Sequence, residues 1–170
     1  MSSHRMRNMH QAAREYVSRY GTPNQIRVIE IGSRNINGTV RDLFPRAQWV
    51  GLDLSDGFCV DLVCDAAKYQ PMIPVDLVVC CEVLEHAADW RDLIEAGVSW
   101  LVPGGRLIVT CAGPTRKTHS AVDGGPLQPG EHYENITVAE LCRAMQTCGL
   151  WIDSAESLGE DTRASGVLAG

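Results

Sequence analysis

The stretch "RVIEIGSRNINGTVRDLF", residues 27–44, decides the fold. It opens with a run rich in Val and Ile, which is typical of a strand buried on both faces of a parallel sheet. A loop of small polar residues follows, with a glycine at each edge, Gly32 and Gly38. The residues after Gly38 predict a short helix that ends before Pro45. A strand, a glycine-bounded loop and a helix start together indicate a place where backbone amides meet a ligand, and a nucleotide cofactor is the natural candidate.

The loop alone is a weak sign, because an ordinary turn from strand to helix has the same composition. It is neither a G-x-G-x-x-G fingerprint nor a P-loop, since the chain contains no G-K-[ST] sequence. The next strand strengthens the case, because Asp53 stands at its end, twenty-one residues after Gly32. An acidic side chain at that distance suits the two hydroxyls of a ribose. A solvated aspartate is the common alternative, and the glycine loop favours the ribose.

Strands and helices alternate along most of the chain. Strands are predicted over residues 26–32, 48–55, 59–65, 74–83 and 104–113, with two last short strands over 150–158 and 165–170. Helices are predicted over residues 9–20, 38–44, 89–101 and 137–148. Asp89 is expected to be the N-cap of the third helix, and Thr137 with Glu140 forms a capping box on the fourth. The polar connection over residues 114–135 is long enough to be functional.

This alternation predicts an α/β fold, namely a three-layer, doubly wound, mostly parallel sheet of the Rossmann-like kind. Residues 1–170 are expected to form a single domain. A shortened pair of strands at the C-terminus is an alternative within this fold. Ligands of such sheets lie at the carboxyl ends of the strands, near the switch in strand order. The loops that carry polar residues here all follow strands, so we expect the functional site at that edge.

Composition excludes several classes of function. The chain of 170 residues carries a formal net charge of −6, which argues against a broad surface for nucleic acid. Its seven cysteines are odd in number and form no C-x-x-C pair, so reduced thiols in a cytoplasmic protein are expected and a metal site is not. No stretch is apolar over the length of a transmembrane helix, and the first residues do not form a secretory signal. We therefore expect no membrane partner.

Three further motifs separate the two cofactors that fit a ribose-binding strand end, NAD and S-adenosylmethionine. The third strand ends in "CDAAK", where Asp65 would read an adenine amino group, and the fourth ends in "CCEVLEH". The fifth strand is introduced by "LVPGGRLIV". On these motifs the chain resembles class I S-adenosylmethionine-dependent methyltransferases of the branch with a "VLEH" signature. The resemblance covers residues 27–150, with "VIEIG" similar to motif I and "VGLDLS" to motif II.

The resemblance implies a role for several residues by their position. The family usually has further glycines in its first loop, and Arg34 and Ile36 stand in their place here, in what looks like a variant of that loop. The methionine portion of the cofactor is expected beside motif I, the ribose and adenine beside the ends of the second and third strands, and the sulfonium beside the end of the fourth. The implied cofactor-binding residues are Glu30, Gly32, Ser33, Asp53, Leu54, Asp65, Ala66 and Glu82.

Methyl transfer from a sulfonium is an in-line displacement, so the protein must chiefly align the acceptor. A hydroxyl or amine acceptor also loses a proton, and histidine is the usual base. His119 and His132, in the long segment after the fifth strand, are the candidate catalytic residues. His86, Tyr133 and Asn135 are the candidate substrate-binding residues, although Glu85 and His86 suit equally a role as caps of the next helix.

The expected function is transfer of a methyl group to an oxygen, or a nitrogen, of a small molecule or a sugar. Two alternatives stay open. A cofactor-binding or structural module could keep the fold without catalysis, which the replaced glycines would favour. An NAD-dependent oxidoreductase is disfavoured by "VLEH" and by the glycine spacing. The small domain leaves little sequence for a lid. Either a second subunit of a homo-oligomer closes the site, or the site stays open to solvent and accepts a large substrate such as a glycan.

Overall fold

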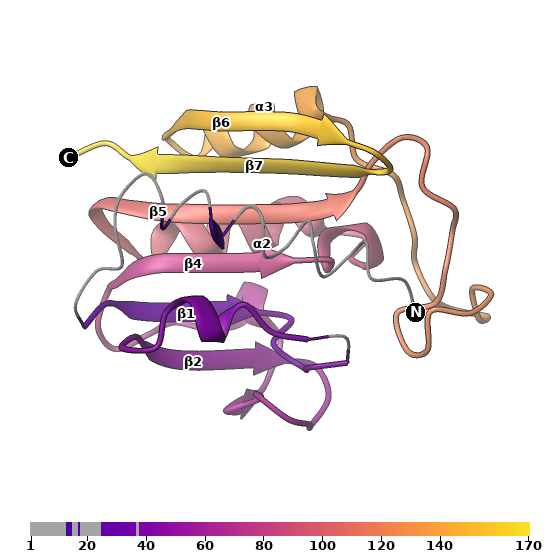
Figure 1. The fold of residues 1–170 in the computed structure, drawn as a ribbon, viewed down its shortest axis with the longest axis horizontal. Helices are drawn as coiled ribbons and strands as arrows, with labels where there is room; N and C mark the ends of the chain where they lie inside the picture. The colour runs from indigo at the N-terminus through magenta and orange to yellow at the C-terminus, as the bar shows by residue number, and fades with distance from the viewer. Residues whose placement is uncertain (1–12, 15–16, 18–24, 37) are drawn as a thin grey trace.

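A seven-stranded sheet organises the protein in the computed structural model, which describes residues 13–14, 17, 25–36 and 38–170 (Figure 1). The strand order is β3-β2-β1-β4-β5-β7-β6. The strands are β1 (Arg27–Ile31), β2 (Gln48–Asp53), β3 (Leu62–Val63), β4 (Val75–Cys81), β5 (Leu101–Ala112), β6 (Leu150–Leu158) and β7 (Asp161–Leu168). The helices are α2 (Trp90–Ser99) and α3 (Val138–Thr147), with 3-10 turns at Arg41–Leu43, Ala66–Lys68 and Leu84–His86.

The first five strands pair in parallel, and β7 inserts antiparallel between β5 and β6. The predicted mostly parallel sheet is therefore confirmed, with its antiparallel pair at the C-terminal end. The strand order reverses at β1, where Ile31 is paired with Leu52 of β2 on one side and with Cys80 of β4 on the other. This is the switch point at which a parallel sheet opens a crevice for a ligand.

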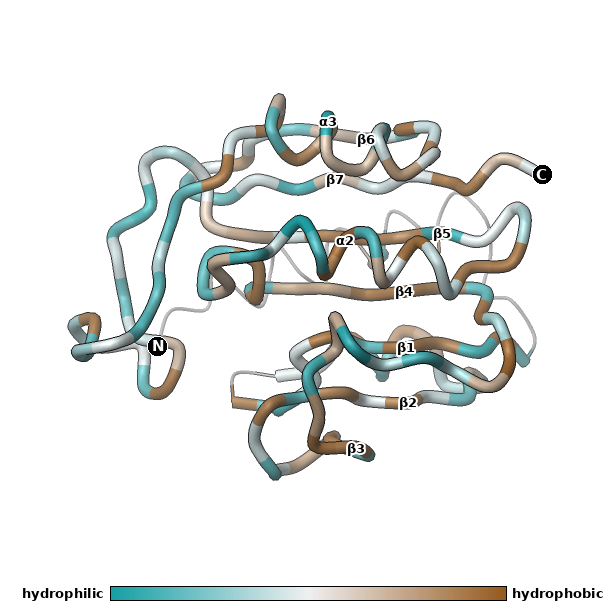
Figure 2. Tube along the Cα trace, turned by 180° about the vertical axis from the view of Figure 1, so that it is seen from behind, coloured by the Kyte–Doolittle hydropathy of each residue, from teal (hydrophilic) through white to brown (hydrophobic). Residues whose placement is uncertain are grey.

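Two hydrophobic clusters on opposite faces of the sheet give the fold three layers. Helices α2 and α3 lie together on one face, in front of the strands in Figure 2. Trp90 and Trp100 are both 1% exposed in this cluster. On the other face Val40 and Phe44 pack with Ala13 against alternate residues of β1 and β4. Because the strands are covered on both faces, they have the nearly continuous apolar sequence from which they were predicted.

Several elements differ in length from the sequence-based prediction. The helix predicted over residues 38–44 is only the 3-10 turn Arg41–Leu43. Gly38 has a φ of 122°, which is not helical, and Pro45 ends the helical turn. The third strand keeps two residues, because Cys59 has a φ of 73° and cannot extend the ladder. Conversely, β7 begins four residues earlier than predicted, at Asp161, so the C-terminal strand pair is not shortened.

The helix ends agree with the sequence in part. The capping box is confirmed, because the Glu140 amide donates to Thr137 Oγ1 at 3.2 Å and the Thr137 amide donates to Glu140 Oε2 at 2.9 Å. Asp89 does occupy the N-cap position of α2, but its side chain makes no capping hydrogen bond. Most of the helix predicted over residues 9–20 lies outside the described residues, and the three described there are helical.

Candidate functional site

A cavity of about 1110 Å³ opens at the carboxyl ends of β1, β2 and β4. It is lined by all eight residues that the resemblance assigned to the cofactor, Glu30, Gly32, Ser33, Asp53, Leu54, Asp65, Ala66 and Glu82. His86 and His119 line it too, whereas His132, Tyr133 and Asn135 do not. The structure therefore gathers the eight predicted cofactor residues around one cavity at this sheet edge, but it places only some of the predicted acceptor residues there.

Gly32 has a different role from the one that the sequence suggested. Its φ is 71°, and a Cβ at this position would lie 2.1 Å from Cγ2 of Val83, which follows β4. The amides of Gly32 and Ser33 both donate to the Leu52 carbonyl, at 2.9 and 3.0 Å. The glycine thus allows the segments that follow β1 and β4 to pack closely together at the switch point. It does not expose its amide to a ligand.

Two further amides of the loop after β1 are also bonded within the protein. The Asn35 amide donates to the Phe58 carbonyl at 2.9 Å, and the Gly38 amide donates to Asn35 Oδ1 at 2.7 Å. The following helix is a single 3-10 turn, so it supplies little dipole. These amides are therefore bonded within the protein, because Asn35 and neighbouring carbonyls accept their bonds.

The carboxylate of Asp53, at the end of β2, accepts one backbone hydrogen bond on each oxygen. The Arg34 amide donates to Oδ2 at 3.2 Å and the Ser55 amide donates to Oδ1 at 2.9 Å. A carboxylate has about four lone-pair sites, so each oxygen keeps capacity for a hydroxyl donor. Beside it, the apolar side chains of Leu54 and Ile36 are 75% and 46% exposed in the cavity lining. A carboxylate next to uncovered apolar surface suits a nucleoside.

Asp65 offers a second ionised acceptor at the cavity edge. Its Oδ1 accepts from the Ala67 amide at 3.1 Å, and its Oδ2 lies 2.8 Å from Lys68 Nζ. The hydrogen bond from Lys68 and the one from the Ala67 amide lower the pKa of Asp65. The carboxylate caps the turn Ala66–Lys68 and so keeps a fixed position after β3.

Glu30 is bound to an arginine that sequence reasoning missed. Arg41 Nε donates to Glu30 Oε2 at 2.9 Å, and the same guanidinium donates to the Cys59 carbonyl at 2.7 Å. Burial raises the pKa of Glu30, and the hydrogen bond from Arg41 opposes this. Gly51 makes room for the arrangement, since a Cβ there would lie 2.1 Å from the Cys59 carbonyl and 2.4 Å from Arg41 Nη2. No motif marks Arg41.

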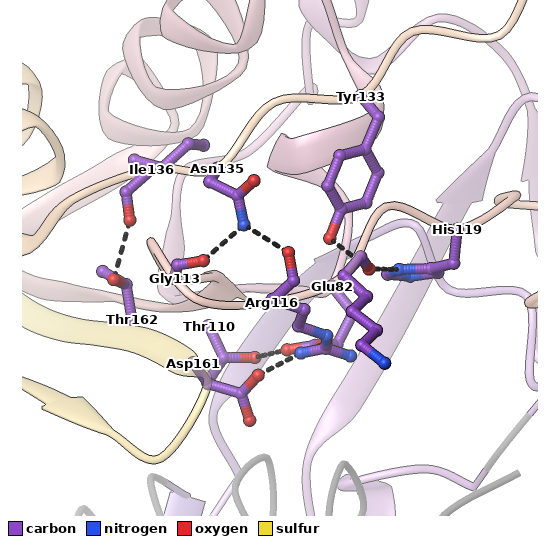
Figure 3. Close-up of polar contacts among 11 residues, drawn as sticks. Glu82, Thr110, Gly113, Arg116, His119, Tyr133, Asn135, Ile136, Asp161 and Thr162 are labelled. Carbon is purple, nitrogen blue, oxygen red and sulfur yellow. Dashed lines mark hydrogen bonds and ion pairs between the residues drawn. The ribbon is translucent and has the colours of Figure 1, made fainter. Parts of the chain in front are cut away.

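Glu82 ends β4 with a left-handed backbone, at a φ of 61°. Figure 3 shows the contacts that hold its side chain: Thr110 Oγ1 donates to Oε1 at 3.0 Å, and Arg116 Nη1 lies 2.8 Å from Oε2. The same Arg116 is paired with Asp161 at the start of β7. Arg116 is buried, and its guanidinium balances the two carboxylates.

The long segment between β5 and α3 is tied down at both ends (Figure 3). Asn135 Nδ2 donates to the Gly113 carbonyl and, at 2.9 Å, to the Arg116 carbonyl. Thr162 Oγ1 donates to the Ile136 carbonyl at 2.7 Å. These bonds close residues 113–136 into a fixed loop over the end of the sheet. Asn135 thus uses both donor bonds of its side-chain amide for this closure, away from the cavity lining.

Three rings gather where this segment meets the turn after β4. The ring centroids of His86, His119 and Tyr133 lie 4.9–5.4 Å apart in edge-to-face pairs. His119 Nδ1 lies 3.1 Å from the Lys117 carbonyl, to which Tyr133 Oη also donates at 3.3 Å. Because a carbonyl only accepts, Nδ1 carries the proton in this bond and Nε2 carries the lone pair. The cluster therefore places a basic nitrogen at the cavity.

Glu85, beneath these rings, is wholly buried. No side chain of the described residues hydrogen-bonds its carboxylate, and the backbone amides of Glu85 and Ala112 favour its charged form. Burial, with the neighbouring charge of Glu82, raises the pKa of Glu85 to about 8. Glu85 and His86 lie in the turn Leu84–His86 and the Glu85 side chain makes no bond to α2, which does not support a role for Glu85 as a helix cap.

Comparison with protein families decides the class. A family model described as a methyltransferase domain matches residues 4–155. The chain belongs to this methyltransferase family. The ubiquinone biosynthesis O-methyltransferase of Aeromonas salmonicida is 31% identical over 85 residues, which cover 45% of this methyltransferase and 36% of that protein. The methyltransferase thus matches only about a third of the length of that relative.

Solved structures share the fold of this methyltransferase. The 1,6-didemethyltoxoflavin-N1-methyltransferase of Burkholderia thailandensis, with bound S-adenosylhomocysteine, superposes with a TM-score of 0.72 at 11% identity, over 95% of this chain and 78% of that one. The N-methyltransferase NodS of Bradyrhizobium japonicum, also with S-adenosylhomocysteine, gives 0.68 at 16% identity, over 97% and 87%. At such identities the likeness establishes the fold. Among the described helices of the methyltransferase, none has the length and hydropathy to cross a membrane.

Proposed function

We propose that this methyltransferase transfers the methyl group of S-adenosylmethionine to an oxygen, or a nitrogen, of a small molecule or a sugar. One observation carries the proposal: the ends of four strands bring eight separately predicted residues into a single cavity of about 1110 Å³. The solved relatives that contain S-adenosylmethionine or its product support the choice of cofactor. The cavity has room for the cofactor and for a small acceptor beside it.

The cofactor would lie along the strand ends in the order that the side chains suggest. Asp53 would accept from the ribose hydroxyls, Leu54 and Ile36 would cover the adenine, and Asp65 would accept from its amino group. The carboxylates of Glu30 and Glu82 would lie toward the positively charged sulfur, where they would favour the cation over a neutral ligand of the same shape. Because Arg41 and Arg116 fix these carboxylates, the site would need little reorganisation on binding.

The reaction asks the protein to align an acceptor behind the methyl carbon. The acceptor atom forms a bond to that carbon while the carbon–sulfur bond breaks, and the sulfonium becomes a neutral thioether. The acceptor proton must also leave, and His119, whose Nε2 carries the lone pair, is the better placed of the two candidate bases because it lines the cavity. His132 lies outside the cavity lining, so we assign it no contact with the acceptor.

Calorimetric titration with S-adenosylhomocysteine tests the proposal. We expect binding by the wild-type protein and a loss of roughly 10- to 100-fold in affinity for Asp53→Asn, as expected from weakened hydrogen bonds to a charged group. The matched control is Asp56→Asn, an exposed aspartate of the same loop that does not line the cavity. Absence of binding would overturn the proposal and favour a module without catalysis. Binding of NADH instead would favour an oxidoreductase.

A further inference from the structure

Arg34 stands in the loop after β1, at a position where the family usually has a glycine. Its side chain is exposed and lines the cavity. The Arg34 amide donates to Asp53 Oδ2 at 3.2 Å, which fixes the backbone of Arg34 beside the carboxylate that would accept from the ribose. The stem of the side chain lies against the loop after β2, where a Cβ on Gly57 would be 2.9 Å from Arg34 Cγ. Arg34 therefore brings a long cationic side chain to the ribose end of the cavity.

No described residue balances the charge of Arg34. Among the described residues that line the cavity, the basic side chains other than histidine are those of Arg34 and Lys68. Lys68 Nζ lies 2.8 Å from Asp65 Oδ2, whereas no described carboxylate forms an ion pair with Arg34. A guanidinium is always charged, and an unbalanced positive charge in the lining of a site for a sulfonium ion weakens binding. Arg34 would thus oppose the cofactor unless the ligand itself supplied an anion.

The backbone of the same loop has few donors left for an anion. Five of its amides donate to oxygen atoms of the protein, namely those of Gly32, Ser33, Arg34, Asn35 and Gly38. The loop leads into a single 3-10 turn, which does not supply the helix N-terminus at which anions are commonly bound. A carboxylate at this end of the cavity therefore needs a donor from a side chain.

S-adenosylmethionine carries one such group, the carboxylate of its methionine portion, which is ionised at neutral pH. A short flexible chain joins this carboxylate to the ribose, and an arginine side chain that starts beside the ribose spans a comparable distance. We propose that the Arg34 guanidinium binds the carboxylate of the cofactor and selects the cofactor by that group. The planar fork of an arginine matches the two oxygens of a carboxylate, and such charge-assisted pairs are strong. This inference rests on the proposed function, because it requires that the cavity take S-adenosylmethionine.

The assignment matches the charges of the cavity to those of the cofactor. The carboxylates of Glu30 and Glu82 would lie toward the sulfonium, and the guanidinium of Arg34 would meet the carboxylate. Turning the guanidinium from Gly57 into the cavity breaks no ion pair with a described residue, so the turn costs chiefly side-chain entropy. A ligand without the carboxylate would leave the charge of Arg34 uncompensated, and the site would discriminate against it for that reason.

Calorimetric titration with two ligands tests the assignment. One is S-adenosylhomocysteine, and the other is decarboxylated S-adenosylhomocysteine, which keeps the adenosine, the sulfur and the amino group. We expect the wild type to bind the first ligand roughly 10- to 100-fold more tightly than the second, and Arg34→Gln to lose this preference. Arg34→Gln should bind the decarboxylated ligand at least as tightly as the wild type does, because the variant removes a positive charge from a site for a cationic amine. That binding also shows that the variant is folded.

The matched control is Arg143→Gln, at an exposed arginine of α3 that does not line the cavity, and it should keep the wild-type affinity for both ligands. An equal loss of affinity for both ligands in Arg34→Gln would overturn the inference, because the arginine would then serve the adenosine. An undiminished preference for the ligand with the carboxylate would overturn it as well. In both cases the wild type still binds S-adenosylhomocysteine and the proposed function stands. A wild type that binds neither ligand would sink the proposed function and this inference with it.

Discussion

The two sides of the cavity are built in different ways. The side formed by β1, β2 and β3 has its polar groups at the ends of successive strands, and short local hydrogen bonds hold them, such as the Ser55 and Ala67 amides on Asp53 and Asp65. The side formed by residues 113–135 and the turn Leu84–His86 is held by long-range contacts through Arg116 and Asn135. The first side suits a constant cofactor, and the second suits an acceptor that differs among relatives.

The largest expected effect is on the second side. Arg116→Gln leaves Glu82 and Asp161 without their shared cation in a buried place, which should cost about 3–5 kcal/mol in the free energy of unfolding. Urea unfolding measures it. Lys117→Gln, at the exposed neighbour, is the matched control and should change stability by less than about 0.5 kcal/mol. Similar losses in both variants would show that the buried ion network does not support this side.

At the switch point between the two sides, Gly32→Ala should cost about 3 kcal/mol, because the new methyl group adds overpacking to backbone strain. Gly104→Ala is the control for strain alone, since Gly104 has a φ of 80° and no atom lies within 4 Å of the place that a Cβ would take, and it should cost about 1 kcal/mol. Urea unfolding compares the two. Equal costs would mean that contact with Val83 does not govern the choice of glycine.

Asn135→Ala tests whether the two sides are independent. The variant removes the hydrogen bonds to the Gly113 and Arg116 carbonyls, so we expect a loss of about 1–2 kcal/mol and faster proteolysis within residues 113–135. The affinity for S-adenosylhomocysteine should stay within about twofold, a change of about 0.4 kcal/mol. A large fall in that affinity would break the comparison, because it would show that the segment supports the cofactor side.

The last prediction concerns the pH dependence of stability. The pKa of Glu85 is raised to about 8, so the folded chain keeps a proton that the unfolded chain releases near its ordinary pKa of 4.5. This contribution to stability is complete below pH 4.5 and is lost as the pH rises through 8. Glu85→Gln should therefore lose less stability than the wild type between about pH 6 and 9. Parallel profiles from thermal unfolding would show that Glu85 ionises normally.

The cofactor side was largely predictable because its residues follow strands directly. Asp53 and Asp65 stand at the ends of apolar runs, and parallel strands bring such ends to one edge. The reason offered for Gly32 was wrong, since the sequence shows a glycine but not the Val83 side chain that requires it. Arg41 and Gly51 were missed because their partners are a distant carboxylate and a distant carbonyl.

The sequence by itself determined the α/β class, the parallel core and the edge at which the cavity opens, because apolar periodicity and strand ends are local properties of the chain. Only the tertiary structure decided which histidine reaches the cavity, that Arg116 is buried between two carboxylates, and that Glu85 lies against His86 and His119. These outcomes depend on how a segment of more than twenty residues closes over the sheet, and closure is governed by contacts between residues far apart in sequence.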